Sequence, residues 1–220
     1  MNPSIEGLYF VEKTRIAVPA GVILPSAFLR FFHPISEKAA RFIDSKAFQC
    51  SIPKNKFLLR SGQVCPYLFL VSKGLFRGYI VDGKNEATTW ITAENDLVAS
   101  ISSFFDHSPS VENIQALEDL DLIGIHFDDL EVAYQKFPEL NTAARKVLQQ
   151  LYRQAEERAY LVRLAKASSR YTYFQEHQPE LVNRVSLKFI ASHLGMTLET
   201  LSRLRGSILR PSTDNSEKSI

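Results

Sequence analysis

The chain has 220 residues, 45% of them hydrophobic and 23% charged, with a formal net charge of +2, which is ordinary for a soluble globular protein of one or two domains. No apolar run reaches the 18 or so residues of a membrane span, and charges at Glu6, Glu12, Lys13 and Arg15 do not fit a secretion signal. We therefore expect a cytoplasmic protein with no membrane partner.

Charge is divided unevenly along the chain. Residues 1–137 contain 13 Lys/Arg and 16 Asp/Glu, a net charge of −3, whereas residues 138–220 contain 13 Lys/Arg and 8 Asp/Glu, a net charge of +5. An acidic part followed by a basic part fits a sensor domain joined to a module that binds a polyanion. Solvated helix faces would give the same asymmetry by chance.

Cysteine and histidine usage gives no sign of a metal or catalytic site. Cys50 and Cys65 are too few for a disulfide framework and lack the spacing of metal ligands, so we expect two buried thiols. The five histidines are scattered, with no HxH or HxxxH spacing. We expect no enzyme activity, no catalytic residues and no bound metal.

The first part of the chain predicts an arm followed by short helices. Residues 1–26 show no sustained period and contain Pro19, Gly21 and Pro25, so we expect a loosely attached arm. The pattern from Ala27 to about Phe48 is helical, with a break at His33-Pro34 and a restart at the capping signal Ser36-Glu37.

Between Ala47 and Phe127 short β-rich runs alternate with turn residues. Asp82-Gly83 is a strong hairpin signal, because a tight turn needs positive φ where glycine sits. Evenly spaced short strands without intervening helices predict an antiparallel barrel or roll. The expected strands are Phe57–Arg60, Tyr67–Ser72, Leu75–Val81, Ala87–Ile91, Val111–Leu117 and Leu120–His126.

After Asp128 the apolar residues recur with a helical period, and a single long helix is expected over Pro138–Ala167. Thirty helical residues would extend about 45 Å, more than a small domain needs, so we expect this helix to pack on a second copy in a homodimer. The alternative is a helix lying along its own β domain. The expected interface residues are Leu140, Ala144, Val147, Leu151, Ala155, Arg158 and Val162.

The stretch VSLKFIASHLGMTLETLSRLRG, from Val185 to Gly206, predicts a helix-turn-helix. Ser186 is the expected N-cap of a first helix, Gly195 supplies the left-handed residue that ends it, and Thr197 caps a second helix. The small Ala191 stands where two crossing helices approach closely. The inward apolar positions are Leu187, Ile190, Ala191, Leu194, Leu201 and Leu204.

The outward face of the second helix carries side chains that can read DNA bases. Glu199, Ser202 and Arg203 are spaced i, i+3 and i+4 and therefore project together. A glutamate can accept a hydrogen bond from cytosine N4, and an arginine can donate two to guanine O6 and N7. A Glu–Arg ion pair on a solvated helix is the alternative reading of the same residues.

These residues resemble those of the Crp/Fnr family of bacterial transcription regulators, over roughly residues 35–206. The likeness is to the short-wing members common in Bacteroidetes-type genomes, and it is carried by KFLLRSGQVCPYLFLVSKGLFRGYIVDGKNEATTWI, by NIQALED and by LKFIASHLGMTLETLSRLR. The resemblance implies an α+β fold, in which an antiparallel β-roll of the jelly-roll, cyclic-nucleotide-binding-like type precedes a long dimerisation helix and a small helix-turn-helix domain.

The resemblance also divides the chain and assigns roles to residues. Glu199 and Arg203 inherit base contacts and Thr200 a phosphate contact, and we expect Ser202 and Leu198 on the base-reading side and Lys188, Arg205 and Ser186 near phosphates. Leu198 stands where some members place arginine, so one contact is expected to be missing. The expected parts are residues 1–26 as the arm, 27–137 as the β-roll with its flanking helices, 138–167 as the dimerisation helix, 168–210 as the helix-turn-helix domain and 211–220 as a polar tail.

The expected effector pocket departs from the family's nucleotide-binding pattern. Where those members have a Gly-Glu pair for the ribose, this chain has Ala99-Ser100, and where they have an Arg-Ser pair for the cyclic phosphate, it has Ser110-Val111. Without a guanidinium a buried phosphate keeps its charge unneutralised. We expect no cofactor and no cyclic AMP at the pocket formed by Ala99, Ser100, Ile101, Ser110 and Val111.

The resemblance also raises two other kinds of sensor that occur in the family. Two cysteines cannot supply the four thiolates of an iron–sulfur cluster, and a haem ligand among His33, His107, His126 and His177 stays open. The expected partners are double-stranded DNA, a second copy of the chain, RNA polymerase and an unidentified small-molecule effector. The alternative function is a ligand-binding or protein-interaction module that no longer binds DNA, which the short polar tail after Gly206 would favour.

Overall fold

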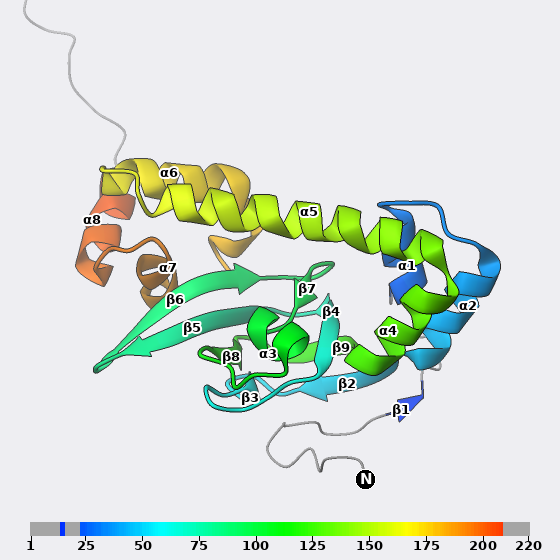
Figure 1. Ribbon diagram of the computed structural model, residues 1–220. Helices are drawn as coiled ribbons and strands as arrows, with labels where there is room; N and C mark the ends of the chain where they lie inside the picture. The colour runs from blue at the N-terminus through cyan, green and yellow to red at the C-terminus, as the bar shows by residue number, and fades with distance from the viewer. Residues whose placement is uncertain (1–13, 16–22, 209–220) are drawn as a thin grey trace, which may run out of the picture. The chain divides into compact units, whose positions relative to one another are not determined.

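The computed structural model describes residues 14–15 and 23–208, and the chain divides into two compact units at Ala155 and Glu156 (Figure 1). The first unit combines antiparallel sheets with helices, and the second is helical, which confirms the expected α+β class. Helix α5, Pro138–Leu161, runs from the first unit into the second. Within the described ranges, none of the helices has the length and apolar character to cross a membrane.

Two antiparallel sheets build the first unit. One has the strand order β1-β2-β9-β4-β7 and the other the order β3-β8-β5-β6. The strands are β1 Thr14–Arg15, β2 Phe48–Ile52, β3 Phe57–Leu59, β4 Tyr67–Lys73, β5 Phe76–Asp82, β6 Asn85–Thr92, β7 Leu97–Val98, β8 Asn113–Ala116 and β9 Leu120–His126.

Alternation along the strands gives the first sheet an inner and an outer apolar face. In β4, Tyr67, Phe69 and Val71 belong to the core between the sheets, whereas Leu68 and Leu70 pack against other groups on the outer face. Both cysteines are buried in the inner core, which confirms that expectation. The inner core comprises Cys50, Ile52, Leu58, Leu59, Cys65, Tyr67, Phe69, Val71, Phe76, Val98, Ile114, Ala116, Leu120 and Leu122.

Two glycines shape the β5–β6 hairpin. Gly83 has a φ of 61°, and Asp82 pairs with Asn85 across it, so the hairpin turn expected at Asp82-Gly83 is confirmed. Gly78 lies under the indole of Trp90, where a Cβ would come within 2.1 Å of the ring. Only glycine lets the indole lie against the strand there.

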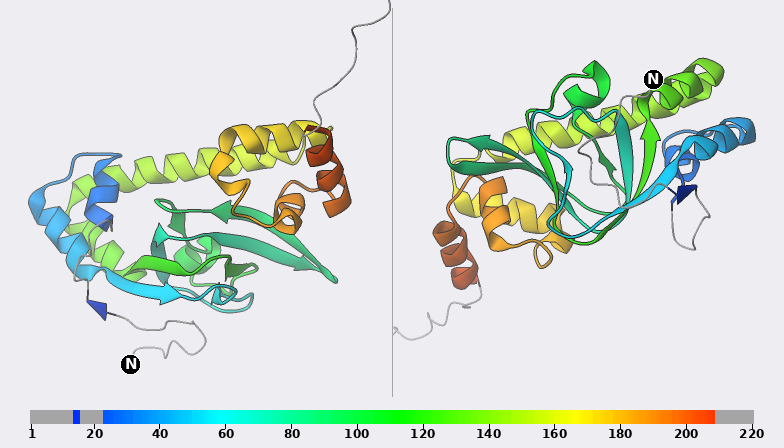
Figure 2. Two further views of the ribbon diagram at one scale, coloured as in Figure 1. Left: turned by 180° about the vertical axis from the view of Figure 1, so that it is seen from behind. Right: turned by 90° about the horizontal axis from the view of Figure 1, so that it is seen from below.

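Short helices gather at one end of the first unit, as both views from the side show (Figure 1; Figure 2, left). They are α1 Pro25–Arg30, α2 Glu37–Lys46 and α4 Phe127–Lys136, and α3 Ile101–Asp106 joins β7 to β8. A second core forms where these helices meet the first turns of α5. It comprises Ile35, Ala39, Ala40, Ile43, Phe104, Ile125, Leu130, Ala133, Leu140 and Ala143.

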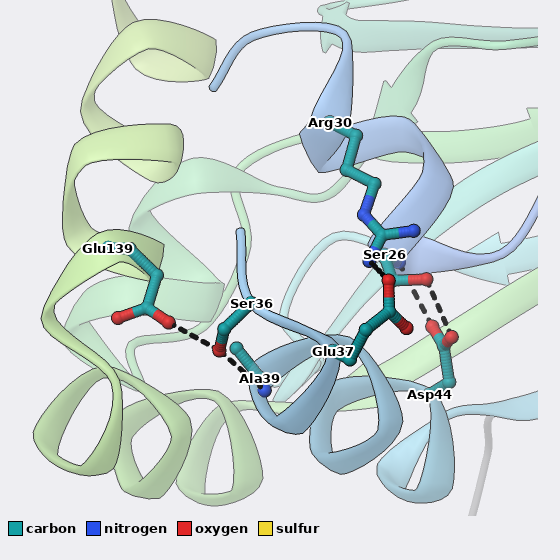
Figure 3. Close-up of polar contacts among 7 residues, drawn as sticks. All are labelled: Ser26, Arg30, Ser36, Glu37, Ala39, Asp44 and Glu139. Atoms are coloured by element: carbon teal, nitrogen blue, oxygen red, sulfur yellow. Dashed lines mark hydrogen bonds and ion pairs between the residues drawn. The ribbon is translucent and has the colours of Figure 1, made fainter. Parts of the chain in front are cut away.

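Polar contacts fix α1, α2 and the start of α5 to one another (Figure 3). Ser36 caps α2, because its Oγ accepts a hydrogen bond from the Ala39 N–H at 3.2 Å, and it donates to Glu139 Oε1 at 2.7 Å. That donated bond lowers the pKa of Glu139. Ser26 donates to the Asp44 carboxylate through both its N–H and its hydroxyl, at 2.9 and 2.6 Å. The new helix expected to begin at Ser36-Glu37 is therefore confirmed as α2, with Ser36 as its N-cap.

The long helix is shorter than the sequence predicts. It ends at Leu161, and the N–H groups of Arg163 and Leu164 bond to the carbonyls three residues earlier in tighter turns. Two guanidinium groups donate hydrogen bonds to backbone carbonyls at this end of the helix. Arg163 donates to the carbonyl of Ala159, and Arg170 donates to the carbonyl of Leu164. The expected end at Ala167 is wrong, because that residue begins helix α6.

Besides β1, three short elements of the first unit were not expected. The sequences of β2, β7 and α3 are too short or irregular to show a strand or helix period of apolar residues. The strand expected to begin at Val111 begins at Asn113.

The expected arm lies largely outside the described residues. Thr14 and Arg15 pair with Gln49 and Phe48, so this part of the arm is the edge strand of a sheet rather than loosely attached.

The second unit contains the predicted helix pair. After α5 come α6 Ala167–His177, a single 3₁₀ turn at Pro179–Leu181, α7 Leu187–His193 and α8 Leu198–Ile208, coloured yellow to red in Figure 1. Helix α8 contacts both α6 and α7. Tyr171 and Phe174 of α6 are buried in this unit, as are Leu181 and Val185 between α6 and α7.

Candidate nucleic-acid interface and effector pocket

The turn between α7 and α8 has the geometry expected of a helix-turn-helix. Gly195 has a φ of 61°, and the N–H of Met196 bonds to the carbonyl of Ala191 at 3.0 Å, which closes the end of α7. Thr197 caps α8, since its Oγ1 accepts from the Thr200 N–H at 3.2 Å. Ser186 stands at the N-cap of α7, but its side chain makes no capping hydrogen bond.

The two helices are fixed by a small apolar contact. Ile190, Ala191, Leu194 and Leu201 are each no more than 2% exposed, and Leu187 and Leu204 are half-buried. Each of the inward positions expected from the sequence is therefore at least half-buried. Because Leu201 and Leu204 form the inward side of α8, the opposite side of the helix faces solvent.

The expected base-reading residues share that outward side. Glu199, Ser202 and Arg203 are exposed, and Leu198 at the start of α8 is 43% exposed. The pKa of Glu199 lies below its ordinary value, because its carboxylate accepts hydrogen bonds from its own N–H and from the Thr197 side chain and lies near the charge of Arg203. Glu199 is therefore a charged acceptor at neutral pH.

The expected phosphate contacts differ in exposure. Lys188 and Ser186 are exposed, whereas Thr200 and Arg205 are half-buried. The hydroxyl of Thr200 hydrogen-bonds to that of Thr197 at 3.1 Å, so it takes part in the cap as well. All four residues belong to α7 and α8 or to the N-cap of α7.

Arg170 is a residue of this region that the sequence reading missed. Its guanidinium donates to the carbonyls of Leu164 and Gly195, and so ties the start of α6 to the turn before α8. A lone arginine in an amphipathic helix gives no pattern by which this role could be recognised.

The two serines of the expected effector pocket bond to each other. Ser100 and Ser110 are each 2% exposed, and their Oγ atoms are 2.9 Å apart. Ser110 donates its hydroxyl proton to the Glu112 carbonyl at 2.9 Å, so Ser100 is the donor in the Ser–Ser bond. The structure thus joins the two positions that the resemblance aligns with the Glu and Arg of nucleotide-binding members.

The other expected pocket residues do not converge on these serines. Ala99 packs against the second core, Ile101 is 58% exposed and Val111 is 74% exposed. Beside the serine pair, the Glu112 carboxylate accepts a hydrogen bond from the Trp90 indole at 2.8 Å. A carboxylate and two neutral hydroxyls give no cationic partner for a phosphate.

Helix α5 presents to solvent an apolar stripe that shares only Ala155 with the interface residues expected from the sequence. Leu140 is fully buried and Val147 is 6% exposed, and both lie within their own unit. This part of the expected interface is corrected, because the most regular apolar stripe covers the subunit's own core. The other expected members range from half-buried Ala144, Leu151 and Arg158 to exposed Ala155 and Val162.

A neighbouring apolar stripe on α5 is exposed. Leu148 is 46% and Tyr152 71% exposed, and Ala155 follows at the same helical spacing. The spacings of four and three residues are those of a coiled-coil seam. We call Leu148, Tyr152 and Ala155 the outer stripe of α5.

The fold is that of known bacterial regulators. No protein-family model and no curated protein matches the sequence. Among solved structures, FixK2 from Bradyrhizobium japonicum is similar with a TM-score of 0.62 and 21% identity over 74% of this chain and 84% of that chain. The c-di-GMP-responsive regulator CLP from Xanthomonas campestris has a TM-score of 0.63 and 14% identity over 79% and 92%.

A regulator from Eubacterium rectale that is assigned to the crp/fnr family has a TM-score of 0.62 and 16% identity over 80% of this chain and 84% of that chain. The chain therefore has the fold of Crp/Fnr-type regulators, a cyclic-nucleotide-binding-like β-roll followed by helices. Identities this low establish the fold and leave the function to be argued from the site.

Proposed function

We propose that the chain is a homodimeric, DNA-binding transcription regulator of the Crp/Fnr type. The observation that carries this proposal is the outward side of α8, where Glu199, Ser202 and Arg203 are exposed together on a helix anchored by Thr197 and Gly195. A helix held in this way can enter the major groove with these side chains against the base edges.

Charge supports nucleic acid as the partner. Residues 138–220 carry a net charge of +5, and the exposed cation Lys188 lies on α7 beside the proposed recognition helix. Each cation that neutralises a phosphate releases a condensed counterion and adds affinity that falls with salt. Binding to duplex DNA should therefore weaken steeply as ionic strength rises.

The outer stripe of α5 supports a homodimer. Leu148 and Tyr152 are large apolar or amphipathic side chains that the subunit itself leaves 46% and 71% exposed. Packing against the same stripe of a second copy would bury them in a two-fold interface. A dimer would present two recognition helices to successive major grooves about 34 Å apart.

The effector of this proposed regulator is not a cyclic nucleotide. The hydrogen-bonded Ser100 and Ser110 offer no charge to a phosphate, and Glu112 beside them carries a carboxylate. Burial of an unneutralised phosphate costs several kcal/mol. Any ligand of the first unit must therefore be recognised by other groups.

Fluorescence anisotropy with a labelled pool of random duplexes tests the proposal against a protein-interaction module. The full chain should bind the pool at low salt and lose affinity as salt rises, and the variant with Lys188→Glu, Arg203→Glu and Arg205→Glu should bind at least a hundred-fold more weakly. The matched control places the same charge changes on Arg41, Lys54 and Lys56 of the first unit. Equal binding by the two triple variants would contradict the assignment of DNA binding to α7 and α8.

A further inference from the structure

The first unit contains an apolar cavity of about 290 Å³ on the outer face of its first sheet. Leu68 and Leu70 of β4 and Ile123 and Ile125 of β9 form its floor, and side chains of α1, α3 and α5 form its walls. This is the face of the sheet opposite the inner core, and neither Ser100 nor Ser110 lines it. Its volume is near the lower end of that of small-molecule sites.

Arg145 is the single charged side chain among the residues that line this cavity. It is exposed on α5, at the rim, and no carboxylate lines the same cavity. Asn141, another polar side chain of the lining, already donates to the Tyr134 carbonyl at 2.8 Å. A ligand with an apolar body would therefore meet one cation.

A negative charge lies in a pocket that adjoins this cavity. This second pocket shares Phe28, Val147 and Leu151 with the first and is lined by Asp96 and Gln154. The helical period of 3.6 residues puts Gln154 and Arg145 on opposite sides of the α5 stripe that lines both pockets. An anionic group would be repelled at the Asp96 end and attracted at the Arg145 end.

We propose that this cavity binds a small apolar monocarboxylate of the medium-chain fatty-acid class, with its chain over the leucines and isoleucines of β4 and β9 and its carboxylate paired to Arg145. Within the regulator proposed above, such a ligand is the effector. Leu148 both lines the cavity and belongs to the outer stripe of α5, so occupancy acts directly on the surface that pairs two subunits.

Calorimetry of the full chain with decanoate, in the absence of DNA, measures this binding. We expect saturable binding, with affinity rising about four-fold for each methylene from hexanoate to decanoate as more of the chain is buried. Arg145→Gln should weaken decanoate at least ten-fold and leave decanol unchanged. The matched control, Arg41→Gln on the exposed face of α2, should bind decanoate like the wild type.

Ala144→Leu provides a second test, because it places three more carbon atoms inside the cavity. It should abolish decanoate binding while circular dichroism shows an unchanged fold. Saturable binding that neither Ala144→Leu nor Arg145→Gln alters would overturn the proposal, as would the absence of saturable binding. If decanoate binds only to a monomeric Tyr152→Asp variant, a side chain of the second copy fills the cavity in the dimer. That result would also overturn the proposal. Because no DNA is present, failure here leaves the proposed DNA binding untouched.

Discussion

Arg203 and Lys188 should contribute to DNA binding in different ways. Arg203 lies on the proposed base-reading side, so Arg203→Ala should cost about 1–3 kcal/mol per half-site and relax the preference at one base pair. Lys188→Ala should weaken all sequences alike and reduce the slope of log affinity against log salt by about one. Anisotropy titrations over a salt series with one specific and one scrambled duplex measure both. The reverse assignment of the two effects would refute the proposed roles.

The bonded serine pair makes a prediction about ligands. Neither cyclic AMP nor cyclic GMP should bind with micromolar affinity, because Ser100 and Ser110 leave the cyclic phosphate without a cation. Isothermal calorimetry decides the point. Saturable micromolar heat with either nucleotide would mean that another cation neutralises the phosphate, and Arg77→Gln and Lys84→Gln would then identify it.

The buried thiols should be inert in the folded protein. Burial raises the pKa of Cys65 to about 11, with a smaller opposing effect from its hydrogen bond to the Tyr67 carbonyl. The thiolate is the reactive form, so at pH 8 we expect no labelling of the native chain by Ellman's reagent and two labelled thiols per chain in denaturant. Rapid labelling of one native thiol would show that this part of the core opens readily.

Single residues were predictable from the sequence where their role is local. Thr197 and Gly195 act through backbone groups within a few residues of themselves, and their pattern indicates both roles directly. The Ser100–Ser110 bond joins residues of two different segments, and its existence depends on how the sheet places them. Arg170 was missed for the same reason, since one of its partners lies 25 residues further along the chain.

At the scale of elements, the outer stripe of α5 makes the dimer testable. Tyr152→Asp places a charge on a side chain that is 71% exposed in the subunit, so the subunit should fold normally and fail to dimerise. Light scattering should report a monomer, and DNA binding should weaken because one recognition helix is lost. Arg153→Asp, on the exposed side away from the stripe, is the matched control and should remain dimeric.

A dimeric Tyr152→Asp protein would show that the outer stripe is not the interface. Leu151, which lies in the stripe expected from the sequence, is a poorer test because it lines the apolar cavity of its own subunit. Aspartate there would disturb the fold of the subunit as well as any interface.

The helical period of apolar residues in α5 could be predicted from the sequence. Which surface each apolar stripe packs against could not. A helix shows two overlapping apolar stripes when one side packs on its own domain and an adjacent side is free, and the sequence alone does not rank them. Leu140 is buried because it packs in the core that α2 and α4 form with α5, and buried Val147 lines the apolar cavity on the outer face of the sheet. Strands bounded by glycine turns were predictable, whereas β7 and α3 are too short to show a period.

At the scale of the whole molecule, the proposed regulator combines a β-roll in which Ser100 and Ser110 offer no charge to a phosphate with a helix pair that we propose reads DNA. The fold shared with FixK2 and CLP fits this arrangement. Two-fold symmetry in the proposed dimer requires two-fold symmetry in the DNA that it prefers. The operator should therefore be an inverted repeat whose half-site centres are about one helical turn, 34 Å, apart.

Selection of bound sequences from random duplex DNA, performed in parallel with the wild type and Arg203→Ala, tests the central claim that α8 reads DNA sequence. The wild type should enrich an inverted repeat with a conserved guanine and cytosine in each half-site, which we assign to Arg203 and Glu199. Arg203→Ala should enrich the same repeat with the preference at the guanine lost. If the wild type enriches no repeat, or if Arg203→Ala enriches an unchanged one, α8 is not the element that reads the bases.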